Sequence, residues 1–354
     1  MELKPTYGNF QVTGTIYDFL KNKEGEIVNT GITTNGQPWK SIRISIQTTE
    51  NNIITVELFG MAKDTVRASK REGTGKDTKY VNKDFAWDKR GNLPKDYSLS
   101  GLDAVTYTTD EEKQAKNNNI TKVAYDAIDD IVEIFKSGDA VFIRGGLTFN
   151  EYNGDTRPRC SVQRILRADE TKFEKEGNEP CSKFEQTVVV RSTKLEKEEK
   201  RLYIDALIVT DKNGNFVEKE FYVDIAEREK LAKNIKKLSE FTQIKLIGDI
   251  INEAIISETS EVEDDGWGED KVMQKKVVEG YVSSLRVTMA DPETIIDAAY
   301  NVSDFVKKDE LSDELSDEEI GDLVDEEDEI FENDSLDDLG DKIEVEESED
   351  DGWL

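Results

Sequence analysis

Strict alternation of apolar and polar side chains marks residues 51–60, NNIITVELFG, as the clearest strand of the chain. Ile54, Val56 and Leu58 point to one side, which the pattern predicts to be a core face. Phe59 points to the other side, which we expect to face water. An exposed ring gains from a flat partner, so we interpret Phe59 as a residue that stacks on a nucleobase. The alternative is a core or dimer-contact ring.

The first 168 residues predict the order strand, strand, strand, helix, strand, strand. In the strand 39–47, Trp39 and Arg43 point outward; the alternative role for Trp39 is a plug at one end of a barrel. The predicted elements are strands at 10–19, 39–47 and 51–60, a helix from Ile120 to Lys136 with Asn119 as N-cap and Gly138 ending it, a strand and hairpin at 138–154, and a return strand at 160–166. This is the order of an OB fold, a five-stranded Greek-key barrel whose open face binds oligonucleotides.

Two segments of this region carry a family resemblance. VELFGMAKD at 56–64 and GDAVFIRGGLTFNEYNG at 138–154 resemble the OB domain of bacterial and phage single-stranded DNA-binding proteins. The resemblance implies that Phe59, at the LFG strand end, stacks on a base, and that Tyr152 does so where the family often has Trp. A third stacking Trp of that family falls on Ile53 here. The resemblance also implies a phage-encoded protein; for Tyr152, packing on its own loop stays open.

A basic insertion, residues 63–118, separates the LFG strand from the predicted helix. Its part 63–95 holds ten Lys or Arg and five acids, interleaved with aromatic rings. Cations neutralise phosphates and release counterions, and rings stack bases for about 1–3 kcal/mol each. The alternative for the insertion is that its rings pack on their own barrel. For Arg43, Arg144, Arg157 and Arg159, the alternative is a solvated surface charge. The predicted DNA contacts are Trp39, Arg43, Phe59, Tyr80, Lys83, Phe85, Trp87, Lys89, Arg90, Arg144, Tyr152, Arg157 and Arg159.

The pattern of the first domain recurs after a polar, charged linker at 169–182. Residues 183–300 again predict strands, a DKNGN hairpin turn, a helix from Ala226 to Leu238 and two closing strands, so we expect a second OB-like barrel. No close internal sequence identity supports the repeat. Its outward acids would repel phosphate, which favours an architectural or protein-contact role, with Tyr203 and Tyr222 as alternative stacking residues. Those acids are Asp205, Glu218, Glu220 and Asp224.

Residues 301–354 form an acidic tail with three basic and 25 acidic residues. Such a segment buries too little apolar surface to offset its ordering entropy, so we expect disorder. An acidic run with an apolar tip is how single-stranded DNA-binding proteins commonly end, which makes Asp350, Asp351, Trp353 and Leu354 predicted partner-binding residues. EDDGW at 263–267 repeats 349–353, so Trp267 is a second candidate, predicted to lie in an acidic loop. A solubilising tail and a chance repeat are the alternatives.

Charge and composition narrow the function classes. The net charge is −31, yet residues 1–167 carry 24 basic and 23 acidic residues, so the first domain is compatible with a polyanion. The chain has no histidine and two cysteines, Cys160 and Cys181, which we expect as reduced thiols. No leader or membrane-length apolar run appears, so a soluble cytoplasmic protein is expected. If the chain is phage-encoded, as the resemblance implies, that is the cytoplasm of the host bacterium.

The sequence thus predicts a mainly β protein with two OB-like barrels and a disordered tail. It would coat single-stranded DNA in replication, recombination or repair, without catalysis, cofactor or metal, and recruit partners through the tail. We find no spaced carboxylate motif and no phosphate-cradling glycine loop. The alternatives are a metal-dependent nuclease and an acidic interaction protein or nucleic-acid mimic that ignores DNA.

Overall fold

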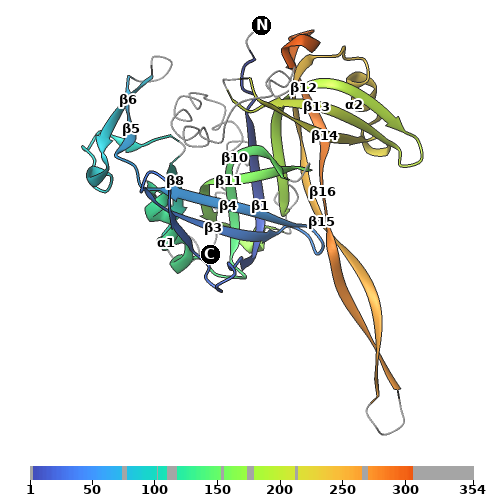
Figure 1. The fold of residues 1–354 in the computed structure, drawn as a ribbon, viewed down its shortest axis with the longest axis horizontal. Helices are drawn as coiled ribbons and strands as arrows, with labels where there is room; N and C mark the ends of the chain where they lie inside the picture. Colours follow the sequence, from blue (N-terminus) through green and yellow to red (C-terminus); the bar gives the residue numbers. More distant parts are fainter. Residues whose placement is uncertain are drawn as a thin grey trace, which may run out of the picture.

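The computed structural model describes residues 3–73, 78–101, 103–109, 118–152, 155–173, 179–211, 214–264 and 270–305, and it is mainly β (Figure 1). The strands of the first half are β1 (Gly8–Phe19), β2 (Asn29–Ile32), β3 (Pro38–Gln47), β4 (Ile53–Met61), β5 (Thr65–Glu72), β6 (Lys79–Ala86), β7 (Ser98–Leu99), β8 (Ala104–Thr108), β9 (Asn119–Val123), β10 (Ala140–Tyr152) and β11 (Asp155–Arg167). Those of the second half are β12 (Cys181–Glu196), β13 (Arg201–Val209), β14 (Phe216–Asp224), β15 (Thr242–Asp264) and β16 (Asp270–Ile296). The helices are α1 (Ala124–Ile134) and α2 (Ile225–Ile235).

Five strands of the first half close into a barrel, which we call the N-terminal barrel. β1 pairs with β3, β3 with β4, β4 with β11 in parallel, β11 with β10, and β10 with β1. Ile42, Ile44 and Ile46 of β3 are almost fully buried, as their alternation predicts. Helix α1 packs Ala127 and Ile131 into the same core. This closed order is the OB topology expected from the sequence.

The second half repeats this closure as the C-terminal barrel. β12 pairs with β13, β13 with β14, β14 with β16 in parallel, β16 with β15, and β15 with β12. Helix α2 follows β14 and buries Ala232 and Ile235. Both barrels therefore share one strand order, although their sequences show no close identity.

The two barrels join through their first strands. β1 and β12 pair antiparallel, with Phe10 opposite Phe184. The pairing of β1 with β3 has a register shift after Ile16, and the pairing of β12 with β13 has one after Val190. The sequence separation between Ile16 and Val190 equals that between Phe10 and Phe184. Phe10 and Phe184 are thus equivalent residues that lie on a pseudo-twofold axis between the barrels.

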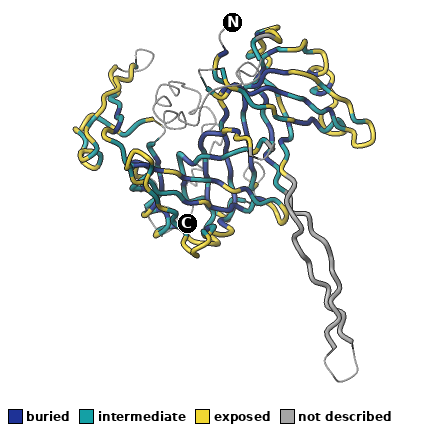
Figure 2. Tube along the Cα trace, in the orientation of Figure 1, coloured by how far each residue is buried: buried dark blue, intermediate teal, exposed yellow. Residues whose placement is uncertain are grey.

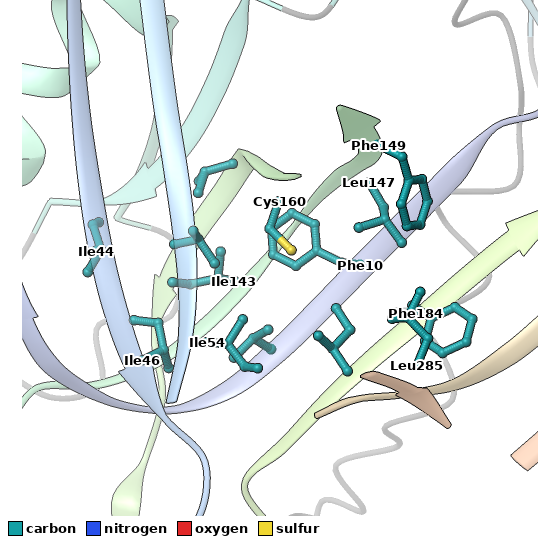
Figure 3. Packing of buried hydrophobic residues seen from close by; sticks show 14 of the residues in the cluster. Phe10, Ile44, Ile46, Ile54, Ile143, Leu147, Phe149, Cys160, Phe184 and Leu285 are labelled. Atoms are coloured by element: carbon teal, nitrogen blue, oxygen red, sulfur yellow. The ribbon is translucent and has the colours of Figure 1, made fainter. Parts of the chain in front are cut away.

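One hydrophobic core runs through both barrels. Figure 3 shows Phe10, Leu147 and Phe149 of the N-terminal barrel near Phe184 and Leu285 of the C-terminal barrel. The ring of Phe221 lies 6.5 Å from Phe149 and 5.7 Å from Phe184. The predicted domains 1–168 and 183–300 are therefore connected by packing as well as by the chain. Among the described residues, no helix is long and apolar enough to cross a membrane.

Several element predictions were wrong. The helix expected from Ile120 starts at Ala124, because residues 119–123 form β9 and pair with β8. Val123, not Asn119, is the N-cap, and Phe135 is the C-cap, while Gly138 adopts a positive φ in the following turn. The acidic loop expected at 263–267 is partly strand, because β15 runs to Asp264 and pairs with β16.

The linker and the insertion also contain structure that the sequence pattern did not indicate. A short 3-10 helix occupies Glu170–Lys172, and β12 begins at Cys181, inside the predicted linker 169–182. The insertion folds into a separate sheet in which β5 pairs with β6 and β7, and β8 extends the barrel sheet beside β11. In Figure 1, β5 and β6, drawn in cyan at the left, stand away from the barrel.

Candidate nucleic-acid interface

The outer face of β3 and β4 carries a pair of stacked rings. Trp39 and Phe59 lie with their ring centroids 5.9 Å apart and their planes at 29°. Phe59 is 44% exposed and Trp39 is half-buried. Phe59 points outward because it alternates with buried Val56 and Leu58 across the strand. The parity of β4 therefore places this ring outside the barrel core, as expected, and Trp39 is its neighbour rather than a buried plug.

Trp39 keeps its position because its cross-strand neighbour is a glycine. Gly31 of β2 lies opposite Trp39 in the β2–β3 pair, and a Cβ on Gly31 would come within 2.5 Å of the indole ring. The glycine thus lets the Trp39 indole lie against β2, and Phe59 is the ring next to it. The two rings form a platform open to solvent on the side of Phe59.

Charged side chains flank the ring pair. Arg43 is exposed on the same face of β3 and lies opposite Glu57 of β4. Arg159 of β11 donates two hydrogen bonds to the Glu57 carboxylate, of 2.8 and 3.1 Å. The structure therefore brings Arg43 and Arg159 close to the rings, but it gives Arg159 a carboxylate partner.

The hairpin between β10 and β11 lies against the C-terminal barrel. Lys219 of β14 donates a 2.7 Å hydrogen bond to the carbonyl of Thr156. Arg157 is exposed and Arg144 is half-buried on β10. Tyr152 ends β10, and its side chain lies outside the described residues, so its predicted stacking role stays a prediction.

The predicted DNA contacts of the insertion divide into two groups. Trp87 packs edge-on against Tyr125 of α1, and Arg90 lies over the Trp87 ring while it forms an ion pair of 2.8 Å with Asp126. Phe85 packs edge-on against Tyr97 within the insertion. Trp87 and Arg90 thus pack on α1, whereas Phe85 packs within the insertion and not on the barrel.

The second group is open to solvent. Tyr80 is 60% exposed, and Lys83 and Lys89 are exposed. Lys83 lies 5.3 Å from the centroid of the Phe85 ring, on the same side of β6. These three side chains are accessible to a nucleic acid, whereas Trp87 and Arg90 hold the insertion against α1.

Two features near the interface escaped the sequence reading. Lys40 lies over the Tyr125 ring at 4.8 Å and forms an ion pair with Asp129, which ties β3 to α1. Arg71 lies directly opposite Tyr80 in the β5–β6 pair. The alternation in β5, TVRASKRE, indicates that Arg71 lies on the same face as Arg67. The sequence did not show that β5 pairs with β6, which places Tyr80 opposite Arg71.

The equivalent face of the C-terminal barrel has different chemistry. The shared register places Tyr203 and Tyr222 where the N-terminal barrel has Arg43 and Glu57. The guanidinium of Arg201 covers the Tyr222 ring at 4.5 Å, which leaves Tyr222 buried. Tyr203 donates a hydrogen bond to Glu199, and this bond raises the pKa of Tyr203. The described strands β13 and β14 therefore carry no ring on this face that is as exposed as Phe59.

The predicted partner-binding residues fall in two parts of the sequence, the segment around Trp267 and the end of the acidic tail. Trp267, Asp350, Asp351, Trp353 and Leu354 lie outside the described residues. The last described segment, residues 299–305, packs on the C-terminal barrel, where Phe305 contacts Tyr300, Phe216 and Phe241. Phe305, where the described residues end, is therefore held on the C-terminal barrel by ring contacts.

Comparisons with known proteins define the family. A model of the YorF family matches residues 9–321, so the chain belongs to the YorF family. No curated protein matches the chain. Its fold is similar, at a TM-score of 0.36, to crystal structures of the single-stranded DNA binding protein from Thermus aquaticus. The wild-type structure has 8% identity and covers 81% of this chain and 93% of that one; a deletion mutant has 7% identity and covers 82% and 95%.

Proposed function

We propose that this protein binds single-stranded DNA, without catalysis, along the outer face of β3 and β4. The observation that carries the proposal is the Trp39–Phe59 ring pair on the outer face of a closed OB barrel. In OB folds this strand face and its bordering loops receive oligonucleotides. Arg43 stands beside the rings to neutralise a phosphate.

Ring stacking selects an unpaired strand. Phe59 is 44% exposed, so one face of its ring is open to a base. A duplex hides the faces of its bases inside the stack, whereas a single strand presents them to any aromatic side chain. Every base has a flat face, so such binding tolerates all sequences. This chemistry suits a protein that coats exposed strands.

The cellular setting is the finer part of the proposal. A coating protein acts in replication, recombination or repair, and its acidic tail recruits partners through Asp350, Asp351, Trp353 and Leu354, with Trp267 as a second docking residue. The expected bacterial cytoplasm and phage origin stay predictions from the sequence. A nucleic-acid mimic, the main alternative, would bind basic proteins and leave DNA unbound.

Anisotropy of labelled oligo(dT) and of a labelled duplex tests the proposal. We expect tight oligo(dT) binding that weakens with salt, with a slope of about −0.7 per phosphate neutralised. Phe59→Ala should lose about 1–3 kcal/mol of binding free energy, because one stacked base loses its platform. Tyr17→Ala is the matched control, since Tyr17 is also an exposed ring, at 57%, but it lies at the register shift of β1 opposite Ser45 and Ile46 and is not part of the ring pair. Equal affinity for duplex and oligo(dT), or equal losses in both variants, would refute the proposal.

A further inference from the structure

The sheet formed by β5, β6 and β7, which we call the arm, has two unlike faces. Figure 2 shows the arm as mostly exposed, in contrast to the barrels. On one face, Val66 and Ala68 of β5 are buried and Phe85 of β6 lies opposite Val66, so this packed face forms a small core of its own. The other face carries the alternate residues of both strands and is open to solvent.

The open face combines a guanidinium with an aromatic ring. Arg71 lies directly opposite Tyr80 in the β5–β6 register, so both side chains share one face. Tyr80 is 60% exposed and Arg71 is exposed, its guanidinium donating a 3.3 Å hydrogen bond to the Thr78 hydroxyl. Nearer the barrel, Arg67 contacts Asp84 across the strands at 3.4 Å. Arg71 and Tyr80 are thus the pair of this face that is available to a ligand.

The arm is fixed beside the candidate interface. β4 ends at Met61, two residues after Phe59, and the chain reaches Thr65 at the start of β5 a few residues later. At its other end, Trp87 packs on Tyr125 and Arg90 forms an ion pair with Asp126, both on α1. β5 has eight residues, which span about 26 Å. A strand bound at Phe59 can therefore continue along a surface held in a defined place.

Charge identifies the ligand that fits. Residues 63–95 carry ten basic and five acidic residues, in a protein whose net charge is −31. A positive arm on a strongly acidic chain is suited to a polyanion. An exposed ring next to a guanidinium adds stacking for a base and a contact for the adjoining phosphate.

We propose that the open face of the arm, through Arg71 and Tyr80, binds a continuation of the same single strand that lies on the Trp39–Phe59 platform. The inference rests on the proposed function and extends it, because one molecule would then cover more nucleotides than a barrel alone. It also assigns separate roles within the insertion: Trp87 and Arg90 anchor the arm, and Arg71 and Tyr80 bind.

Oligonucleotide length separates the two contacts. A single OB fold covers about 4–16 nucleotides, so dT of about 8 nucleotides reports on the barrel and dT of about 30 reports on barrel and arm together. The double variant Arg71→Ala/Tyr80→Ala should bind the long oligonucleotide at least about fivefold more weakly, because one stacked base and one phosphate contact are lost. Its affinity for the short oligonucleotide should stay within about twofold, since the barrel platform is intact.

The register supplies a matched control on the other face. Lys70 lies opposite Val81, one position along from Arg71 and Tyr80, and Val81 is 41% exposed. Lys70→Ala/Val81→Ala removes the same charge and should leave both affinities within about twofold of the parent. Equal losses in the two double variants, an equal loss for both oligonucleotide lengths, or no loss at all would overturn the inference. Failure of the parent protein to bind dT would instead overturn the proposed function.

Discussion

Arg159 donates two hydrogen bonds to Glu57, and this ion pair lies on the same outer face as Phe59. The two side chains come from strands that pair in parallel, β11 and β4, and lie about one hundred positions apart in sequence. A bidentate guanidinium–carboxylate pair is a strong, directional contact. The Glu57 carboxylate therefore offsets the positive charge of Arg159. A substitution of Glu57, or an anion that competes with it, would make this guanidinium available.

Replacing Glu57 by Gln should strengthen DNA binding. The amide keeps the size of the side chain but removes the charge, so Arg159 becomes available to a phosphate. We expect the salt slope to steepen by about 0.7 and the affinity at low salt to rise several-fold. Oligo(dT) titrations at a series of salt concentrations measure both quantities.

Glu218→Gln is the control for this prediction. Glu218 forms an ion pair of 2.5 Å with Arg191 on the C-terminal barrel, so the same change in net charge occurs away from the ring pair. If both variants gain equally, overall charge is responsible and the Glu57–Arg159 pair has no specific effect on binding.

Local pattern predicted the strands of the barrel, and their order along the chain indicated an OB closure, but neither predicted the strand pair that joins the two barrels. The alternation in β3 and β4 correctly placed Ile42 and Leu58 inside and Phe59 outside, because side-chain parity is a property of one strand. The pairing of β1 with β12 and the parallel contact of β4 with β11 depend on residues far apart in the chain. No single-strand pattern contains that information.

The same limit applies to the candidate interface. Trp87 is an aromatic ring in a basic segment, and only its contact with Tyr125 shows that it anchors the arm. Residues 119–123 have an apolar spacing that suits a helix, but pairing with β8 makes them a strand, since tertiary pairing overrides local preference. Arg71 and Tyr80 needed the β5–β6 register before they shared a face.

A methyl group at Gly145 should strongly destabilise the protein. Gly145 follows the register shift of β10 on β11, and a Cβ there would lie 1.9 Å from the carbonyl oxygen of Ser161. Gly248 holds the same place in β15, 1.9 Å from the Arg286 carbonyl oxygen. Each Gly→Ala variant should lose more than about 3 kcal/mol of unfolding free energy, because backbone must move to relieve the overlap.

The neighbouring residue Gly146 is the control for that overlap. A Cβ on Gly146 would meet nothing within 4 Å, so Gly146→Ala should change the unfolding free energy by less than about 1 kcal/mol. Urea denaturation of the three variants measures the difference. Equal stabilities for Gly145→Ala and Gly146→Ala would show that the barrel tolerates the overlap.

Cys160 should be inert in the folded protein. Burial in the core of the N-terminal barrel raises the pKa of the Cys160 thiol to about 12. At pH 8 the folded protein therefore holds almost no Cys160 thiolate, which is the form that attacks thiol reagents. In a Cys181→Ser variant, labelling by a disulfide reagent should proceed only as fast as the protein unfolds. Rapid labelling in the absence of denaturant would show that solvent reaches this part of the core.

Removing the acidic tail should tighten DNA binding most at low salt. Residues 301–354 carry 25 acids and three basic residues, so the tail and a DNA strand are both polyanions that compete for the same cations. The truncation should be made after Phe305, because Phe305 packs on Phe216 and Phe241. Loss of Phe305 would expose these two rings of the C-terminal barrel. A chain ending at Phe305 should bind oligo(dT) several-fold more tightly near 0.01 M salt, where the screening length is about 30 Å. The gain should shrink near 0.1 M salt, where that length is about 10 Å. An unchanged affinity at low salt would rule out competition between the tail and DNA, whereas a gain of the same size at both salt concentrations would rule out an electrostatic origin.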